Sequence, residues 1–118
     1  MHELSIAGAI LDVARSRVPA NCALKTVRVI AGPMRAIEPQ AMQFAWEAVL
    51  DEEQLTDIQL ELKLLPWLLH CPACHREWSS KDLQSACVCG CKSASPIDGD
   101  ELQVSSIEVD DILERACP

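Results

Sequence analysis

Residues 71–91 read CPACHREWSSKDLQSACVCGC, and this cysteine-rich stretch decides how the chain is organised. It opens with a Cys-x-x-Cys pair and closes with three more cysteines after a short loop. Zinc takes four thiolates in a tetrahedron, and two cysteine turns can supply two each. The surrounding segment has few aliphatic residues, and structural zinc can replace a hydrophobic core because its binding contributes about 10–16 kcal/mol. The stretch therefore predicts a zinc-ribbon-like module held by one structural Zn(II) ion.

The expected zinc ligands come from the two cysteine turns. In the second turn, Gly90 permits the tight backbone conformation of a zinc knuckle, which favours Cys87 with Cys89 as the second pair. Cys91 stays an alternative to Cys87, because only Val88 separates Cys87 from Cys89. The predicted ligand set is Cys71, Cys74, Cys87 and Cys89.

The chemistry of such a site argues against catalysis. Four thiolates leave no coordination position for water, so the site supports structure rather than hydrolysis. The alternative is a redox Cys-Pro-Ala-Cys motif, which needs an exposed thiol of low pKa in a βαβ context. The second cysteine cluster favours zinc over this thiol oxidoreductase. The sequence shows no Ser/His/Asp arrangement, phosphate-binding glycine loop or paired carboxylates, and we predict that the protein is not an enzyme.

The segments on either side of the cysteines show helix and strand periodicities. Apolar residues spaced three and four apart predict a helix over residues 3–17, and Glu38 before Pro39 predicts the start of a second helix. The acidic run at residues 51–53 opposes a helix dipole and is expected to be a solvated linker. Alternating apolar residues predict strands over residues 24–31, 58–64 and 102–109.

The cysteine-rich segment lies between the last two predicted strands, so we interpret it as an insertion. The expected fold class is α+β, with a small three-stranded sheet, two helices and an inserted zinc-ribbon-like module. Residues 1–66 would form the first segment of the α/β domain, residues 67–98 the inserted module, and residues 99–118 the final strand and tail.

Composition narrows the function further. The 118 residues carry 10 basic and 18 acidic side chains, a net charge of −8, so an anionic nucleic acid or membrane surface is a poor partner. No stretch approaches the roughly 20 apolar residues of a membrane span, and the N-terminus has no basic or apolar region of a secretory signal. We therefore expect a cytoplasmic protein whose cysteines bind metal rather than form disulfides.

The first residues suggest a second metal site. A large second residue such as His2 should leave Met1 in place, so that the α-amine, the His2 amide and the His2 imidazole follow one another. These nitrogens can close two fused rings around one ion, and Ni(II) or Cu(II) favours such planar nitrogen geometry. Glu3 adds a carboxylate or a compensating charge. The dipeptide alone is also compatible with an ordinary exposed terminus.

An ordered set of motifs resembles the HypA/HybF family of nickel metallochaperones for [NiFe]-hydrogenase maturation. The resemblance covers nearly the whole chain, and its strength lies in the order of the motifs. These are MHELSI at residues 1–6, Ile37-Glu38-Pro39, FAWE at residues 44–47, the two cysteine pairs, and GDEL at residues 99–102 running into SIEV at residues 106–109.

The resemblance implies a nickel domain of helices on a small sheet, with a zinc domain inserted before the last strand. It implies that His2 is a nickel ligand with Glu3 as its neighbour, and that Cys71, Cys74 and Cys89 bind zinc. It also implies transient Ni(II) binding and delivery, with a nickel-handling GTPase accessory protein, to the hydrogenase large subunit. Some members also serve urease, so urease maturation proteins are further expected partners.

Two interpretations of the function follow. The first is a nickel metallochaperone, in which an exposed terminal chelate releases its ion by ligand exchange with a partner. In this interpretation the zinc module holds a docking surface, and His70 or His75 could make it sensitive to pH. The second is a zinc-ribbon interaction or assembly factor that transfers no nickel.

Overall fold

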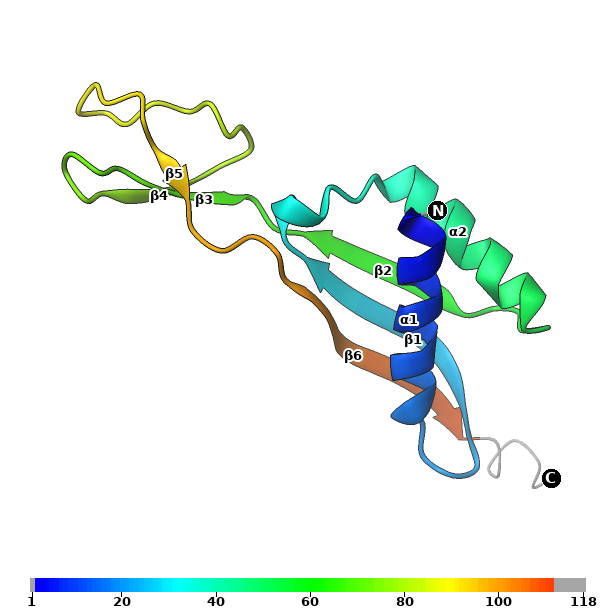
Figure 1. The fold of residues 1–118 in the computed structure, drawn as a ribbon. Coiled ribbons are helices and arrows are strands. Elements are labelled where there is room, and N and C mark those ends of the chain that lie inside the picture. Colours follow the sequence, from blue (N-terminus) through cyan, green and yellow to red (C-terminus); the bar gives the residue numbers. More distant parts are fainter. Residues whose placement is uncertain (1, 112–118) are drawn as a thin grey trace. The chain divides into compact units, whose positions relative to one another are not determined.

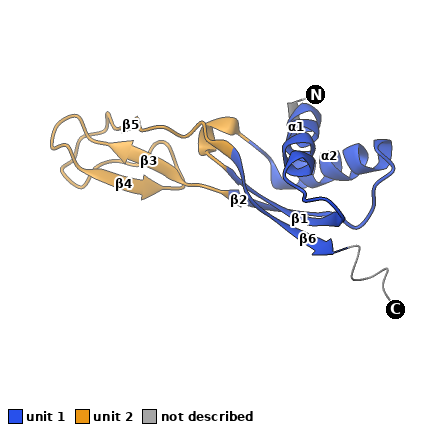
Figure 2. Ribbon diagram, turned by 90° about the horizontal axis from the view of Figure 1, so that it is seen from below, with its two compact units in different colours: residues 1–30, 37–63, 103–118 blue, residues 31–36, 64–102 orange. Residues whose placement is uncertain are grey.

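The computed structural model describes residues 2–111 (Figure 1), which leaves Met1 and residues 112–118, with Cys117, outside the description. The chain divides into two compact units (Figure 2). Unit 1 contains the chain up to residue 30, residues 37–63 and the chain from residue 103. Unit 2 contains residues 31–36 and 64–102.

Two helices belong to unit 1, as the periodicity predicted. Helix α1 spans His2–Ser16 and helix α2 spans Pro39–Glu52. The two helices pack against each other. Ala7 and Ala14 on α1 are fully buried, and between them Leu11 is 1% exposed. Small side chains at these positions allow a neighbouring element to approach α1 closely, whereas Leu4, on the same predicted apolar stripe, is partly exposed.

Local chemistry fixes the ends of α2. Pro39 occupies the first turn, and the Glu38 carboxylate caps the helix by accepting the Ala41 N–H at 2.6 Å. The expectation of a solvated linker from residue 51 is wrong for Asp51 and Glu52, which lie in the last helical turn. The apolar stripe that ends in buried Val49 and Leu50 holds this turn in place despite the unfavourable charge. The stripe is formed by Met42, Ala45, Trp46, Val49 and Leu50.

The main sheet has three strands, as predicted, in the order β2-β1-β6. Strand β1 spans Cys22–Ala31, β2 spans Gln59–Leu64 and β6 spans Leu102–Asp111. Figure 1 shows β1 and β2 running in one direction and β6 in the other, with both helices on one face of the sheet. The core below the helices includes Val27, Val29, Leu60 and Val104, all less than 9% exposed.

A buried tryptophan ties α2 to the sheet. Trp46 is 1% exposed, and its indole N–H donates to the Ile58 carbonyl oxygen at 2.9 Å. The Gln43 side chain makes a parallel bond to the Leu60 carbonyl oxygen at 2.9 Å. Elsewhere on the sheet, Arg28 pairs with carboxylates on both neighbouring strands, Glu61 and Glu108.

Unit 2 contains a second sheet, whose strands are not among those predicted from the sequence pattern. Strand β3 spans Trp67–His70, β4 spans Glu77–Ser80 and β5 spans Ser95–Pro96. The order is β4-β3-β5, and both pairings are antiparallel. Central strand β3 carries Leu69, which is fully buried.

Two segments of unit 2 that are distant in sequence form a backbone clasp. The short helix η1 spans Pro33–Arg35, and the Gly32 N–H just before it donates to the Glu101 carbonyl oxygen at 2.7 Å. Next to it, the Met34 N–H donates to the Gly99 carbonyl oxygen at 2.6 Å. These bonds explain why residues 31–36 belong to unit 2 rather than to the helical unit that surrounds them in sequence.

Between residues 2 and 111, neither helix has the length and apolar character that crossing a membrane requires.

Candidate metal centre

The first cysteine turn is the loop of the β3–β4 hairpin. His70 pairs with Glu77 at the end of the ladder, so residues 71–76 must reverse the chain. Within the loop the Cys71 N–H donates to the Arg76 carbonyl oxygen at 2.9 Å, and the His75 N–H donates to the Cys71 carbonyl oxygen at 2.8 Å. His75 adopts a left-handed conformation with φ of 63°. The turn keeps Cys71 buried and leaves Cys74 exposed.

The second turn repeats this design around residues 87–91. The Gly90 N–H donates to the Cys87 carbonyl oxygen at 2.9 Å, and the Cys87 N–H donates to the Cys91 carbonyl oxygen at 3.1 Å. Gly90 has φ of 96°, and a Cβ atom there would meet nothing within 4 Å. The backbone conformation alone therefore favours glycine at residue 90. Gly90 directly follows Cys89, just as His75, which also has a positive φ, directly follows Cys74.

The two turns bring four thiols together. The sulfur atoms of Cys71, Cys74, Cys87 and Cys89 all lie within 4.8 Å of one another. The Cys71 and Cys89 sulfurs are 3.6 Å apart, and the Cys74 and Cys87 sulfurs are 3.5 Å apart. A tetrahedral zinc ion about 2.3 Å from each sulfur would separate them by about 3.8 Å. The donor type and spacing thus fit zinc with small adjustments, and Cys91 lies outside this four-sulfur group.

The thiols do not ionise alike. The backbone N–H of Cys74, followed by that of Ala73, points at the Cys71 sulfur and lowers the pKa of this thiol to about 6. The N–H of Cys91 acts on Cys89 in the same direction, but the neighbouring thiols and burial outweigh it and raise the pKa of Cys89 to about 12. One thiolate is thus favoured, while full ionisation of the cluster requires a cation to offset the accumulated negative charge.

The two histidines beside the first turn lie close together but outside the four-sulfur group. The ring centroids of His70 and His75 are 5.6 Å apart, and the ring planes are tilted by 40°. His70 is the last residue of β3, and His75 is exposed in the hairpin loop. Their predicted sensitivity to pH stays a prediction.

The predicted nickel residues lie at the start of α1. The helix begins at His2, and Glu3 is in its first turn. The first N–H groups of a helix have no acceptor within the helix. The amides of these two residues are therefore free of helical hydrogen bonds, a backbone arrangement compatible with the expected chelate. Their role as metal ligands stays a prediction.

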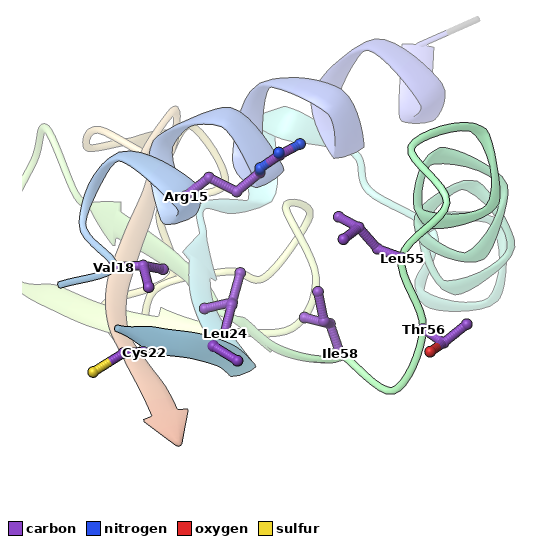
Figure 3. Close-up of a pocket in the computed structure, with 8 residues that line it drawn as sticks. Arg15, Val18, Cys22, Leu24, Leu55, Thr56 and Ile58 are labelled. Atoms are coloured by element: carbon purple, nitrogen blue, oxygen red, sulfur yellow. The ribbon is translucent and has the colours of Figure 1, made fainter. Parts of the chain in front are cut away.

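A hollow in unit 1 encloses about 460 Å³ between the end of α1, the start of β1 and the loop before β2 (Figure 3). Its lining is mostly apolar, including Val18, Leu24, Leu55 and Ile58. Cys22 contributes the only thiol of the lining, and Figure 3 shows its sulfur directed away from Arg15 and Leu55. Cys22 is a free thiol that lies outside the four-cysteine cluster.

The fold and the thiol cluster define a small α+β protein with a four-cysteine metal-binding site. The family model described as "Hydrogenase/urease nickel incorporation, metallochaperone, hypA" matches residues 1–109. The chain belongs to this family of nickel metallochaperones.

Individual relatives agree with this assignment. The hydrogenase maturation factor HypA of Desulfatibacillum aliphaticivorans is 35% identical over 116 residues, which cover 94% of this chain and 88% of the relative. That of Rhodopseudomonas palustris (strain BisA53) is 31% identical over 113 residues, which cover 93% of this chain and 100% of the relative. The solution structure of the Ni metallochaperone HypA from Helicobacter pylori superposes with a TM-score of 0.58 at 23% identity, covering 92% of this chain and 97% of that one. This last similarity shows that the fold is shared.

Proposed function

We propose that this protein binds Ni(II) at its N-terminus and delivers it to the large subunit of a [NiFe]-hydrogenase during maturation. A nickel-handling GTPase accessory protein would assist the transfer, and urease maturation proteins are further candidate partners. The observation that carries the proposal is the family match from residue 1 to residue 109, which includes both the His2-Glu3 start and the four-cysteine cluster. The protein would act in the cytoplasm and without catalysing a reaction.

The proposed nickel chelate uses the first residues of the chain. Its donors are the α-amine of Met1, the amide nitrogen of His2 and the His2 imidazole, with the Glu3 carboxylate as a neighbour. Ni(II) favours planar nitrogen geometry and can displace an amide proton. Because α1 begins at His2, loss of this proton breaks no helical hydrogen bond. The positive end of the helix dipole opposes a cation, and the negative charges of the amide and Glu3 offset it.

Such a site is suited to release as well as binding. A chelate at the end of the chain can be replaced one donor at a time by the ligands of a partner. Protonation of the α-amine, which titrates near pH 8, weakens the chelate in mild acid. The protein thus holds its nickel cargo without enclosing it.

The proposed zinc site lies in unit 2. Cys71, Cys74, Cys87 and Cys89 would hold Zn(II), which when bound supplies a closed structural cross-link and no open coordination position. The cross-link joins the β3–β4 hairpin to the turn at residues 87–91. Zinc would thereby maintain the fold of this unit while nickel binds to and leaves the N-terminal site.

The proposal is tested by calorimetric titration of Ni(II) into untagged, zinc-loaded protein whose N-terminal Met1 has been verified by intact mass. We expect one nickel per chain, a planar nickel absorption band, and loss of both in His2→Ala. His70→Gln is the matched histidine control and should bind nickel as the wild type does. A chain extended by Gly-Ser before Met1 keeps His2 but removes the α-amine from reach, and it should also lose the planar site.

The titration also distinguishes the nickel-carrier function from the alternative, a zinc-ribbon interaction or assembly factor. Equal nickel binding by the wild type and His2→Ala would reject His2 as the anchor. No nickel binding by either protein would reject the carrier function and leave a zinc-ribbon interaction or assembly factor, which the cysteine cluster alone would support.

A further inference from the structure

The outer face of α2 combines a large exposed apolar side chain with a one-sided charge. Phe44 is the only phenylalanine of the chain and is 77% exposed, although aromatic side chains are usually buried in cores or interfaces. It lies on the side of α2 opposite the residues that pack into the core, such as Met42 and Trp46. The fold of unit 1 does not explain this exposure.

Phe44 does not stand alone on a flat surface. A shallow hollow of about 320 Å³ lies beside it, lined by Pro39, Gln40, Gln43, Phe44 and Glu47. The bond from Gln43 to the Leu60 carbonyl oxygen and the capped helix start at Glu38 hold these positions in place. We call these five lining residues the Phe44 face. Each of them has another member three or four residues away, which is the spacing of neighbours on one helix face, so together they form one continuous stripe.

The stretch of sequence that contains the Phe44 face carries acidic side chains and no lysine or arginine. No lysine or arginine occurs between Arg35 and Lys63, whereas this interval contains seven acidic residues. Glu47 borders the hollow, and Asp51 follows one helical turn later. Within residues 2–111, neither of these two carboxylates forms an ion pair. Both are therefore available to cationic groups of a partner.

We propose that the Phe44 face is a docking site for a basic amphipathic helix of a partner protein. An apolar side chain of that helix would enter the hollow against Phe44, and flanking lysines or arginines would meet Glu47 and Asp51. The charge argues against a second copy of this chain, because two such acidic faces would repel each other. It also argues against a phosphate-bearing partner. The proposal goes beyond nickel carriage, since no residue of the Phe44 face belongs to the proposed nickel or zinc site.

The test uses zinc-loaded full-length protein and a synthetic probe, a helical peptide of about four turns built from leucine on one face and lysine on the other. Binding is followed by fluorescence anisotropy of the labelled peptide and by amide chemical shifts of the ¹⁵N-labelled protein. We expect the largest shifts in residues 39–47. We expect Phe44→Ala to weaken binding by about fivefold or more, as at an interface hot spot. Glu47→Gln should weaken it by about two- to threefold, and added salt should reduce this difference.

Matched controls separate this surface from general attraction to an acidic protein. Val13, on α1, is 41% exposed, so Val13→Ala removes an exposed apolar group from the other helix and should leave the affinity unchanged. A peptide with glutamate in place of lysine should not bind. His2→Ala should bind the lysine peptide as the wild type does, so failure of the nickel proposal would leave this result intact.

Three results would overturn the proposal. They are the absence of binding, chemical shifts that map outside residues 39–47, and an affinity of Phe44→Ala equal to that of the wild type. Self-association of the wild type that Phe44→Ala abolishes would replace the basic partner with a second copy. Because Phe44 is exposed, its variant should keep the amide spectrum of the buried core, and this spectrum verifies the fold in the same experiment.

Discussion

The backbone clasp of unit 2 makes Gly32 intolerant of even one added methyl group. Gly32 has φ of −78° and ψ of 161°, an extended conformation that alanine adopts without strain. A Cβ atom there would nevertheless collide with the carbonyl group of Gly99 and lie 3.0 Å from the Glu101 nitrogen. Both neighbours are backbone atoms, which cannot turn aside as a side chain can. The substitution Gly32→Ala must therefore separate the two segments of the clasp.

The cost follows from the bonds that this separation breaks. The Gly32 N–H and the Met34 N–H each donate one backbone hydrogen bond across the clasp, at 2.7 and 2.6 Å. A hydrogen bond contributes about 1 kcal/mol net, and a donor left unpaired in a buried place costs more. Together with the overpacking, we expect Gly32→Ala to lower the free energy of unfolding by about 2–4 kcal/mol.

Gly8 supplies a matched control of opposite sign. It lies within α1, and a Cβ atom there would meet nothing within 4 Å. Gly8→Ala should therefore raise the free energy of unfolding by about 0.5–1 kcal/mol, because alanine loses less conformational freedom in a helix.

The measurement is urea denaturation of zinc-loaded protein, followed by tryptophan fluorescence and by circular dichroism. Trp46 is in the core of unit 1, whereas Trp67 and Trp78 belong to unit 2, so the fluorescence responds to both units. The reasoning is refuted if Gly32→Ala is as stable as the wild type, because the clasp would then yield to a methyl group without loss.

Three further predictions concern the metal centre and the core. Cys87→Ser should lose zinc while Cys91→Ser keeps one zinc per chain, measured by elemental analysis after dialysis; the reverse result would make Cys91 the ligand. In zinc-free protein the Cys71 thiolate should form with a midpoint near pH 6, followed by its ¹³Cβ shift. Because this pKa lies below the ordinary value of 9.0, the resulting stabilisation of the folded state is complete above pH 9 and is lost as the pH falls through 6. An ordinary midpoint in zinc-free protein whose amide spectrum shows the β3–β4 hairpin intact would contradict the turn geometry. Trp46→Phe removes the bond to the Ile58 carbonyl oxygen and should lower the free energy of unfolding by about 1–3 kcal/mol in thermal denaturation, whereas an unchanged stability would show that the bond contributes nothing.

The elements of unit 1 could be predicted because their side chains repeat with the period of the backbone. Alternation around Val27 and Val29 fixed β1, and the Glu38-Pro39 step fixed the start of α2. Periodicity predicts the ends of helices and strands less well. Leu64 continues the alternation of β2 but is 43% exposed, because periodicity does not show where the packing partner ends.

The strands of unit 2 could not be found this way. β3, β4 and β5 contain only four, four and two residues, too few to show a period. They form because the hairpin and the second cysteine turn hold them together. The membership of residues 31–36 in unit 2 likewise depends on the bonds of Gly32 and Met34 to residues far along the chain, which no local pattern reveals.

The candidate metal centre was predictable as a cluster but not in its fourth member. The Cys-x-x-Cys pair and the three later cysteines are visible in the sequence. The choice between Cys87 and Cys91 depends on which sulfur the second turn directs toward the first pair. That direction follows from the left-handed Gly90 and from the bond of the Cys87 N–H to the Cys91 carbonyl oxygen, and both belong to the folded turn.

We propose that the chain holds nickel at its N-terminus, apart from the zinc held by its four clustered cysteines. Native mass spectrometry can test this, because it counts the two metals separately on one intact chain. Wild-type protein given zinc and then nickel should carry one of each, and His2→Ala should carry zinc alone. Nickel retained by His2→Ala, or nickel that displaces the zinc, would contradict the claim.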